Sequence, residues 1–176
     1  MQSPLKNILL KIVRPNKIDT MENYSNIIQV KATPDKVFDA LTHHIPLWWS
    51  EMCSGSSSQA GDIFTIKFGE SVYKTMSVKE AVADAKIIWY VEDSLIAIPG
   101  LKNQTEWIGT TIGWDLERKE NGTEVKVTHI GLHQEIECYE ICANGWIQFI
   151  SSLKQFLETG KGSPYREYAE ERPAGS

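Results

Sequence analysis

The sequence has few cysteines, no long apolar run and no excess of positive charge, and each shortage excludes a class of protein. Its 176 residues include three cysteines, an odd number, and a chain of this length folds without disulfide bonds. We therefore expect reduced thiols and a cytoplasmic location. No apolar run approaches the ~20 residues that cross a bilayer, which excludes an integral membrane protein. The 18 basic and 23 acidic residues give a net charge of −5, which argues against a nucleic-acid partner.

Familiar catalytic and cofactor motifs are also missing. The sequence has no Gly-x-Ser-x-Gly elbow, no phosphate-binding loop and no dinucleotide fingerprint. Cys138 and Cys142 are four residues apart on a predicted helix, but two thiolates fall short of the four ligands of a structural zinc site. His129 and His133 have the same spacing, but only the first lies in a predicted strand. We therefore expect no metal and no cofactor.

The first third of the chain predicts a strand followed by helices. Residues 26–31 indicate a short strand. Thr33 is a good N-cap, and Pro34 fits the first helical position that follows it. The helix should end near residue 44, because Pro46 disfavours helix just before it. An apolar turn with Trp48 and Trp49 comes next.

From residue 62 onward, apolar and polar residues alternate, which indicates strands joined by short turns in an antiparallel meander. We count five strands here, which makes six with the first. Residues 53–61 and 94–103 are predicted to be loops from their composition. The pair Asn121–Gly122 is the strongest hairpin signal, and it favours a type I′ turn.

The last element has a helical period. Apolar residues recur at three- and four-residue steps over residues 135–158, and Gly160 suits a C-cap. The predicted fold is α+β, a curved antiparallel sheet of about six strands around one long C-terminal helix. The predicted organisation is an N-terminal extension over residues 1–23, one domain over 24–162 and a tail over 163–176.

Three segments of this order resemble the START-like, or SRPBCC, superfamily, whose fold is called the helix-grip. They are VKATPDKVFDALT (30–42), GWDLE through NGTEVKVTHIGL (113–132), and Gly-Trp with SSLKQFLETG (145–160). Within that superfamily, the sequence is most similar to proteins named after the C-terminal domain of the activator of heat-shock-protein-90 ATPase. The resemblance covers about residues 26–160.

The resemblance implies a hydrophobic cavity between the sheet and the long helix, able to hold a lipid-like or aromatic ligand. The activator itself has a separate N-terminal domain that engages the chaperone. Only about 25 residues precede the first predicted strand here, so the resemblance gives little ground for chaperone activation.

Tryptophan is the residue type that points most directly to a ligand site. Six tryptophans in 176 residues are unusual, and ligand pockets are mostly apolar and aromatic. Core packing is the alternative reading for any single tryptophan, because each buries a large area. The predicted cavity lining is Phe38, Trp48, Trp49, Phe64, Trp89, Ile112, Trp114, His129 and Trp146.

Two ionisable residues are weak candidates for proton transfer. His129 has the inward parity of its strand, where an imidazole can orient a ligand or act as a base. More often such a histidine is hydrogen-bonded within the core. Glu106 shares inward parity if Ile108 and Ile112 do, although an exposed carboxylate is the simpler reading. The apolar residues 95–101 form a lid, a partner surface or a segment folded onto the core.

These observations lead us to expect a small-molecule binding protein rather than an enzyme. Its ligand is apolar or aromatic and occupies the cavity. The alternatives are a polyketide-cyclase-like or hydrolase-like enzyme that uses the same cavity, and a chaperone-associated interaction module. The sequence leaves the oligomeric state open.

Overall fold

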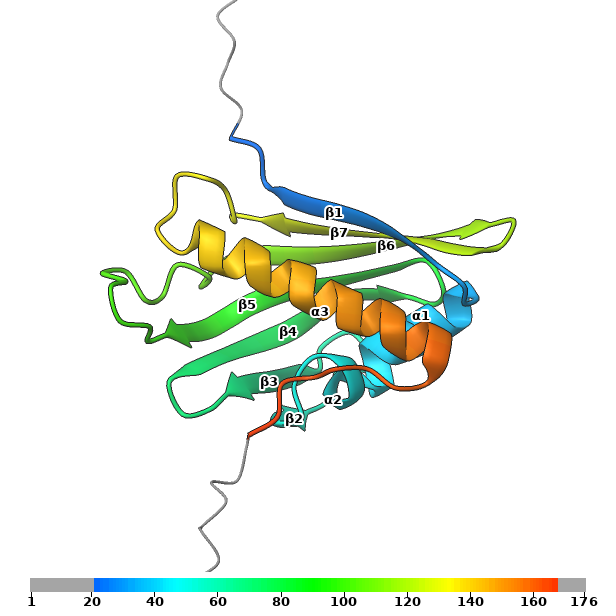
Figure 1. The fold of residues 1–176 in the computed structure, drawn as a ribbon, viewed down its shortest axis with the longest axis horizontal. Helices are drawn as coiled ribbons and strands as arrows, with labels where there is room; N and C mark the ends of the chain where they lie inside the picture. The colour runs from blue at the N-terminus through cyan, green and yellow to red at the C-terminus, as the bar shows by residue number, and fades with distance from the viewer. Residues whose placement is uncertain (1–20, 168–176) are drawn as a thin grey trace, which may run out of the picture.

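Seven strands and three helices make up residues 21–167, the part of the chain that the computed structural model describes (Figure 1). The elements are β1 (Tyr24–Val30), α1 (Pro34–His43), α2 (Ile45–Trp48), β2 (Cys53–Gly55), β3 (Ile63–Phe68), β4 (Val72–Val82), β5 (Lys86–Ile96), β6 (Thr111–Lys119), β7 (Gly122–Ile130) and α3 (Tyr139–Thr159). Most of the predicted N-terminal extension and C-terminal tail lies outside these residues.

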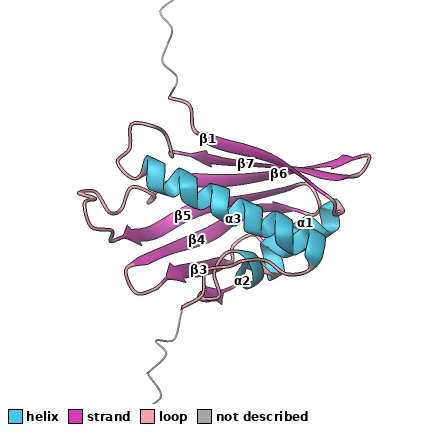
Figure 2. Ribbon diagram, viewed as in Figure 1, coloured by secondary structure: helices cyan, strands magenta, loops and turns pink. Residues whose placement is uncertain are grey.

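The strands form one antiparallel sheet in the order β1-β7-β6-β5-β4-β3-β2. Strands β2 to β7 follow one another as a meander, and β1 adds to the far edge by pairing with β7. Helix α3 lies across one face of the sheet, with α1 and α2 beside its C-terminal half (Figure 2). The predicted α+β helix-grip fold is confirmed.

The sheet has one strand more than the six predicted. Cys53–Gly55 forms β2, which pairs with β3 although its sequence is typical of a loop. Strand β5 also continues to Ile96, through residues predicted to be a loop. Ser94 and Ile96 are buried while Leu95 is only half-buried, so the alternation of a strand persists there. Residues 53–55 and 94–96 are strands because their backbones pair with β3 and β4, and amino-acid composition does not reveal such pairing.

The β6–β7 hairpin exists, but its turn is shifted by one residue. Lys119 pairs with Gly122, so the two-residue loop is Glu120–Asn121. Among the described residues Asp84 alone combines a side chain with a positive φ, so the predicted type I′ turn is wrong. Gly122 has a φ of +150° and begins β7 instead. A Cβ at this position would collide with the carbonyl oxygen of Val30, which explains the glycine.

The predicted helices are present. Helix α1 starts at Pro34 with Thr33 as N-cap, although the Thr33 side chain makes no capping hydrogen bond. Helix α3 begins at Tyr139, four residues later than predicted, because residues before it form turns. It ends at Thr159, and Gly160 follows as the C-cap in the left-handed conformation, with a φ of +81°.

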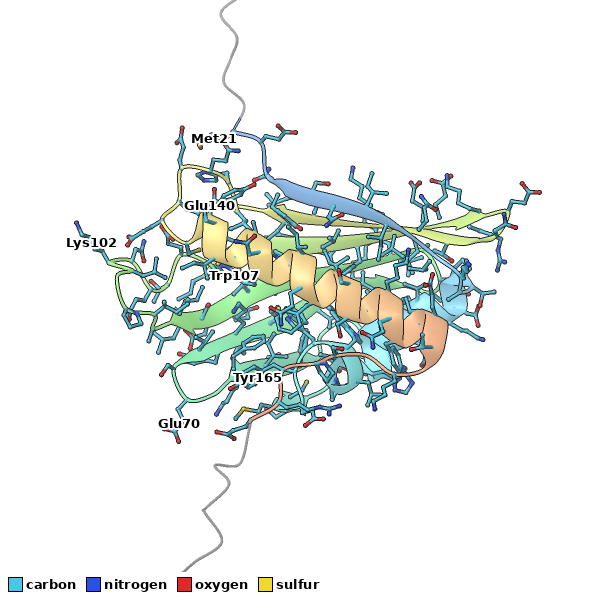
Figure 3. The ribbon with its side chains drawn as sticks, viewed as in Figure 1. Met21, Glu70, Lys102, Trp107, Glu140 and Tyr165 are labelled. Atoms are coloured by element: carbon cyan, nitrogen blue, oxygen red, sulfur yellow. The ribbon has the colours of Figure 1, made fainter. Side chains whose placement is uncertain are left out.

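The segment after α3 returns to the sheet. Tyr165 forms a parallel bridge with Ser50, and its ring packs against Phe68 with 5.4 Å between centroids. Its backbone N–H donates to the carbonyl oxygen of Trp49 at 2.9 Å. Packing against the domain therefore continues to Tyr165 (Figure 3). None of the helices in the described part of the chain is long and apolar enough to cross a membrane.

Candidate ligand-binding site

A cavity of about 200 Å³ lies between α3 and the β4–β5 side of the sheet. Helix α3 supplies one wall, and the ends of β3, β4 and β5 supply the opposite one. Apolar and aromatic side chains predominate in the lining, which is typical of small-molecule sites. The lining residues are Trp49, Phe68, Val72, Lys74, Ile96, Ile98, Trp107, Ile141, Cys142, Gly145, Trp146 and Phe149.

Gly145 leaves part of this space unfilled. It lies in the middle of α3, and a Cβ built on it meets no atom within 4 Å. A glycine inside a helix costs about 1 kcal/mol relative to alanine, so the local helix would be more stable with a side chain there. A larger residue would extend into the cavity. The glycine therefore leaves the cavity open at the expense of helix stability.

Lys74 is the charged residue of the lining. It has the same parity on β4 as Val72 and Met76, and its side chain is only 7% exposed. Its Nζ lies 4.4 Å from the ring centroid of Trp107 and 5.0 Å from that of Phe68. Burial in these apolar surroundings lowers the pKa of Lys74 to about 8.

His129 lies next to the cavity wall and has both ring nitrogens occupied. The indole Nε1 of Trp146 donates to His129 Nδ1 at 3.0 Å. Because an indole only donates, Nδ1 carries no proton and the neutral ring is protonated at Nε2. That Nε2 donates to the hydroxyl of Thr110 at 2.8 Å, and Thr110 donates to the carbonyl oxygen of Trp107 at 2.7 Å.

Burial, and then the nearby charge of Lys74, lower the pKa of His129 to about 3. The imidazole therefore stays neutral at physiological pH. It positions the ring of Trp146, which lines the cavity, and leaves neither nitrogen free for a ligand in this arrangement. This geometry fits a positioning residue better than a general base.

Two thiols at the start of α3 complete the surroundings of Lys74. Trp107 lies beside this end of the helix (Figure 3), and its Nε1 donates to Cys142 Sγ at 3.1 Å. A hydrogen bond between the two thiols raises the pKa of Cys138 and lowers that of Cys142. Trp107 and Lys74 lower the Cys142 pKa further. Cys142 is thus the more acidic thiol.

The structure places the nine predicted lining residues at different depths. Trp49 and Trp146 line the cavity, and their ring centroids are 5.3 Å apart. Phe38 is a half-buried residue of α1 that packs against the core. His129 lies behind Trp146. The others form the buried core beneath the cavity: Trp48, Phe64, Trp89, Ile112 and Trp114.

Glu106 lies in a turn and holds the start of α3. Its carboxylate accepts from the backbone N–H groups of Glu137 at 3.0 Å and Cys138 at 2.9 Å. The alternation of inward and outward side chains does not extend through this segment, because residues 106–109 form a turn before β6. As a result, Trp107 is buried and Ile108 is 45% exposed. Positioning of the helix N-terminus is the role that these contacts support.

Residues 95–101 lie against the domain. Ile96 and Ile98 line the cavity, and Leu101 packs against the core. The backbone N–H of Ala97 donates to the carbonyl oxygen of Ser71 at 3.0 Å, which ties this segment to the start of β4. Of the three readings of this segment, folding onto the core is the one that the contacts match.

Sequence reasoning missed Lys74, Trp107 and Gly145 as site residues. Lys74 carried a usable signal, since it sits between two inward residues of an alternating strand. Trp107 lies in a turn, where the alternation of a strand does not show which side chain is buried. Gly145 was recognisable as a glycine in the middle of a predicted amphipathic helix, where a residue without a side chain leaves space. Within residues 21–167, no three His, Cys, Asp or Glu side chains gather as metal ligands would.

Comparison with known proteins now places this architecture. Residues 31–158 match the family described as "Activator of Hsp90 ATPase homolog 1-like protein". The chain belongs to this family. A search of curated proteins found no match.

Solved structures share the fold of this Hsp90-activator-homologue family member. The solution structure of the Aha1 dimer from Colwellia psychrerythraea is 29% identical, with a TM-score of 0.66, covering 81% of this chain and all (100%) of that one. A Mesorhizobium loti protein is 19% identical, with a TM-score of 0.63 and coverage of 77% and 96%. A putative protein from the dynemicin biosynthetic locus is 19% identical, with a TM-score of 0.59 and coverage of 78% and 48%.

Proposed function

We propose that the protein binds a small apolar or aromatic molecule in the cavity between α3 and the sheet. The observation that carries this proposal is a lining of aromatic residues that Gly145 leaves unfilled. The lining also includes Ile141, which is 45% exposed, so the cavity opens to the surface and a ligand can enter it. The proposal needs no metal and no cofactor.

The cavity size narrows the ligand class. Its volume of about 200 Å³ is below the roughly 300–1,000 Å³ typical of sites for drug-sized ligands. An engineered apolar cavity of about 150 Å³ is known to hold benzene. The cavity therefore suits a single aromatic ring or a short acyl chain rather than a full-length lipid.

The occupied nitrogens of His129 favour binding over a reaction in which this residue moves protons. The enzyme and chaperone-associated alternatives stay predictions, and so does the cytoplasmic location.

Calorimetric titration with benzamide, a neutral single-ring probe, tests the proposal. We expect the wild type to bind it and Gly145→Leu to lose binding, because the added side chain fills the cavity. Asn144→Leu is the matched control, since it adds the same side chain at an exposed position of α3 and should bind benzamide like the wild type. Equal binding by all three proteins would refute a ligand site here, and so would binding of neither benzamide nor benzoate by the wild type.

A further inference from the structure

Lys74 brings a positive charge into the cavity without a carboxylate partner among the described residues. Among the described residues, no carboxylate lies within 4.0 Å of its Nζ, and no side chain or carbonyl accepts a hydrogen bond from it. The π-faces of Trp107 and Phe68 lie next to Nζ, with ring centroids at 4.4 and 5.0 Å. Lysine is almost never this deeply buried unless it is paired.

The groups around Lys74 offset its charge only in part. From α3 it faces Cys138 and Cys142, which attract the ammonium only in the thiolate form, and Lys74 lowers the pKa of Cys142. From β7 it is near His129, which is neutral because Nδ1 accepts from Trp146. Aromatic faces attract a cation but return only part of the hydration that burial removes. The ammonium therefore has unused hydrogen-bonding capacity directed at the cavity.

We propose that the ligand is an aromatic or short apolar acid whose anionic oxygen pairs with Nζ of Lys74. Its apolar part then packs against Trp49, Trp146 and Phe149. This inference rests on the proposed function, and it adds the chemical class of the ligand. A carboxylate supplies the missing counter-charge below pH 8, and a single ring accounts for most of the available volume.

The pairing has a pH dependence with a definite sign. Benzoate stays ionised above pH 5, so only the protein changes charge near neutrality. Lys74 is protonated below a pKa of about 8, so benzoate should bind best below pH 8 and more weakly above it. Benzamide, which has the same shape and no charge, should bind with little change across this range.

The experiment compares benzoate with benzamide by calorimetric titration at pH 7, for the wild type, Lys74→Met and Lys79→Met. Methionine is unbranched and only one heavy atom shorter than lysine, and it removes the charge. Lys79 is the matched control, because it lies on the same strand but is exposed and paired with Glu92 at 3.1 Å. Circular dichroism checks that each variant is folded.

We expect the wild type and Lys79→Met to bind benzoate at least about tenfold more tightly than benzamide, as a buried charge-assisted hydrogen bond provides. Lys74→Met should bind the two probes within about twofold of each other. Equal binding of both probes by the wild type would overturn the inference and leave the proposed function standing. An unchanged benzoate preference in Lys74→Met would also overturn it. Binding of neither probe would overturn both.

Discussion

Replacing Lys74 with methionine is expected to stabilise the fold at pH 7. The pKa of Lys74 falls from 10.5 to about 8 on folding, which corresponds to about 3 kcal/mol at roughly 1.4 kcal/mol per pH unit. Methionine removes this penalty but also removes the cation–π contacts with Trp107 and Phe68. The net gain in unfolding free energy should be about 2 kcal/mol.

The gain should shrink as the pH rises. Between pH 8 and 10.5 the unfolded chain binds a proton at Lys74 more readily than the folded chain does, so raising the pH stabilises the wild type. From pH 7 to 9.5 the difference between wild type and Lys74→Met should narrow by about 2 kcal/mol. Taking the difference between the two proteins cancels the groups whose pKa does not depend on Lys74; Cys142, whose pKa Lys74 lowers, is the exception.

Urea unfolding followed by circular dichroism at pH 7 and 9.5 measures both quantities. Lys79→Met is again the control, and its stability should stay within about 0.5 kcal/mol of the wild type at both values. A Lys74→Met variant that is less stable than the wild type at pH 7 would show that burial of Lys74 carries no such penalty. So would a stability difference that does not change with pH.

Three further predictions concern the surroundings of the cavity. Burial lowers the pKa of His129 from 6.5 to about 3, so between pH 7 and 5 this imidazole binds a proton in the unfolded chain but not in the folded one. Over this range the wild type should therefore lose about 2 kcal/mol more unfolding free energy than His129→Gln does, as measured by urea unfolding. Trp146→Phe leaves His129 Nδ1 buried without its donor and should lower the unfolding free energy by about 2–4 kcal/mol, whereas an effect below 1 kcal/mol would show that this hydrogen bond matters little. Gly122→Ala should destabilise the β6–β7 hairpin by more than about 2 kcal/mol, because its Cβ meets the carbonyl oxygen of Val30; a thermal midpoint equal to that of the wild type would contradict this.

The periodic elements were predictable from sequence because one face of each is buried. The apolar stripe of α3 and the alternation in β6 and β7 follow directly from contact with the same core. Strand β2 was not predictable, because Cys53–Gly55 joins the sheet edge through backbone pairing and buries little. The turn at Glu120–Asn121 was missed because Gly122 is needed for its close approach to Val30.

The sequence indicated where in the fold the candidate site lies, but it indicated few of the individual residues that line the cavity. Tryptophan-rich strands and helices indicated an aromatic interior, but a sequence does not show which rings border the cavity and which fill the core. Trp49 and Trp146 border it, whereas Trp89 and Trp114 lie wholly buried below. Lys74 was overlooked because a lysine is expected on the solvent face. Its inward position is a departure from that rule, and such departures often mark functional sites.

The most direct test of the ligand site is a crystal structure of the protein soaked with 4-bromobenzoate. Bromine scatters anomalously, so its position is found independently of the rest of the density. We predict an anomalous peak inside the cavity beside α3, with the carboxylate at about 2.8 Å from Nζ of Lys74. A bromine site elsewhere with this cavity empty, or a carboxylate turned away from Lys74, would contradict the account.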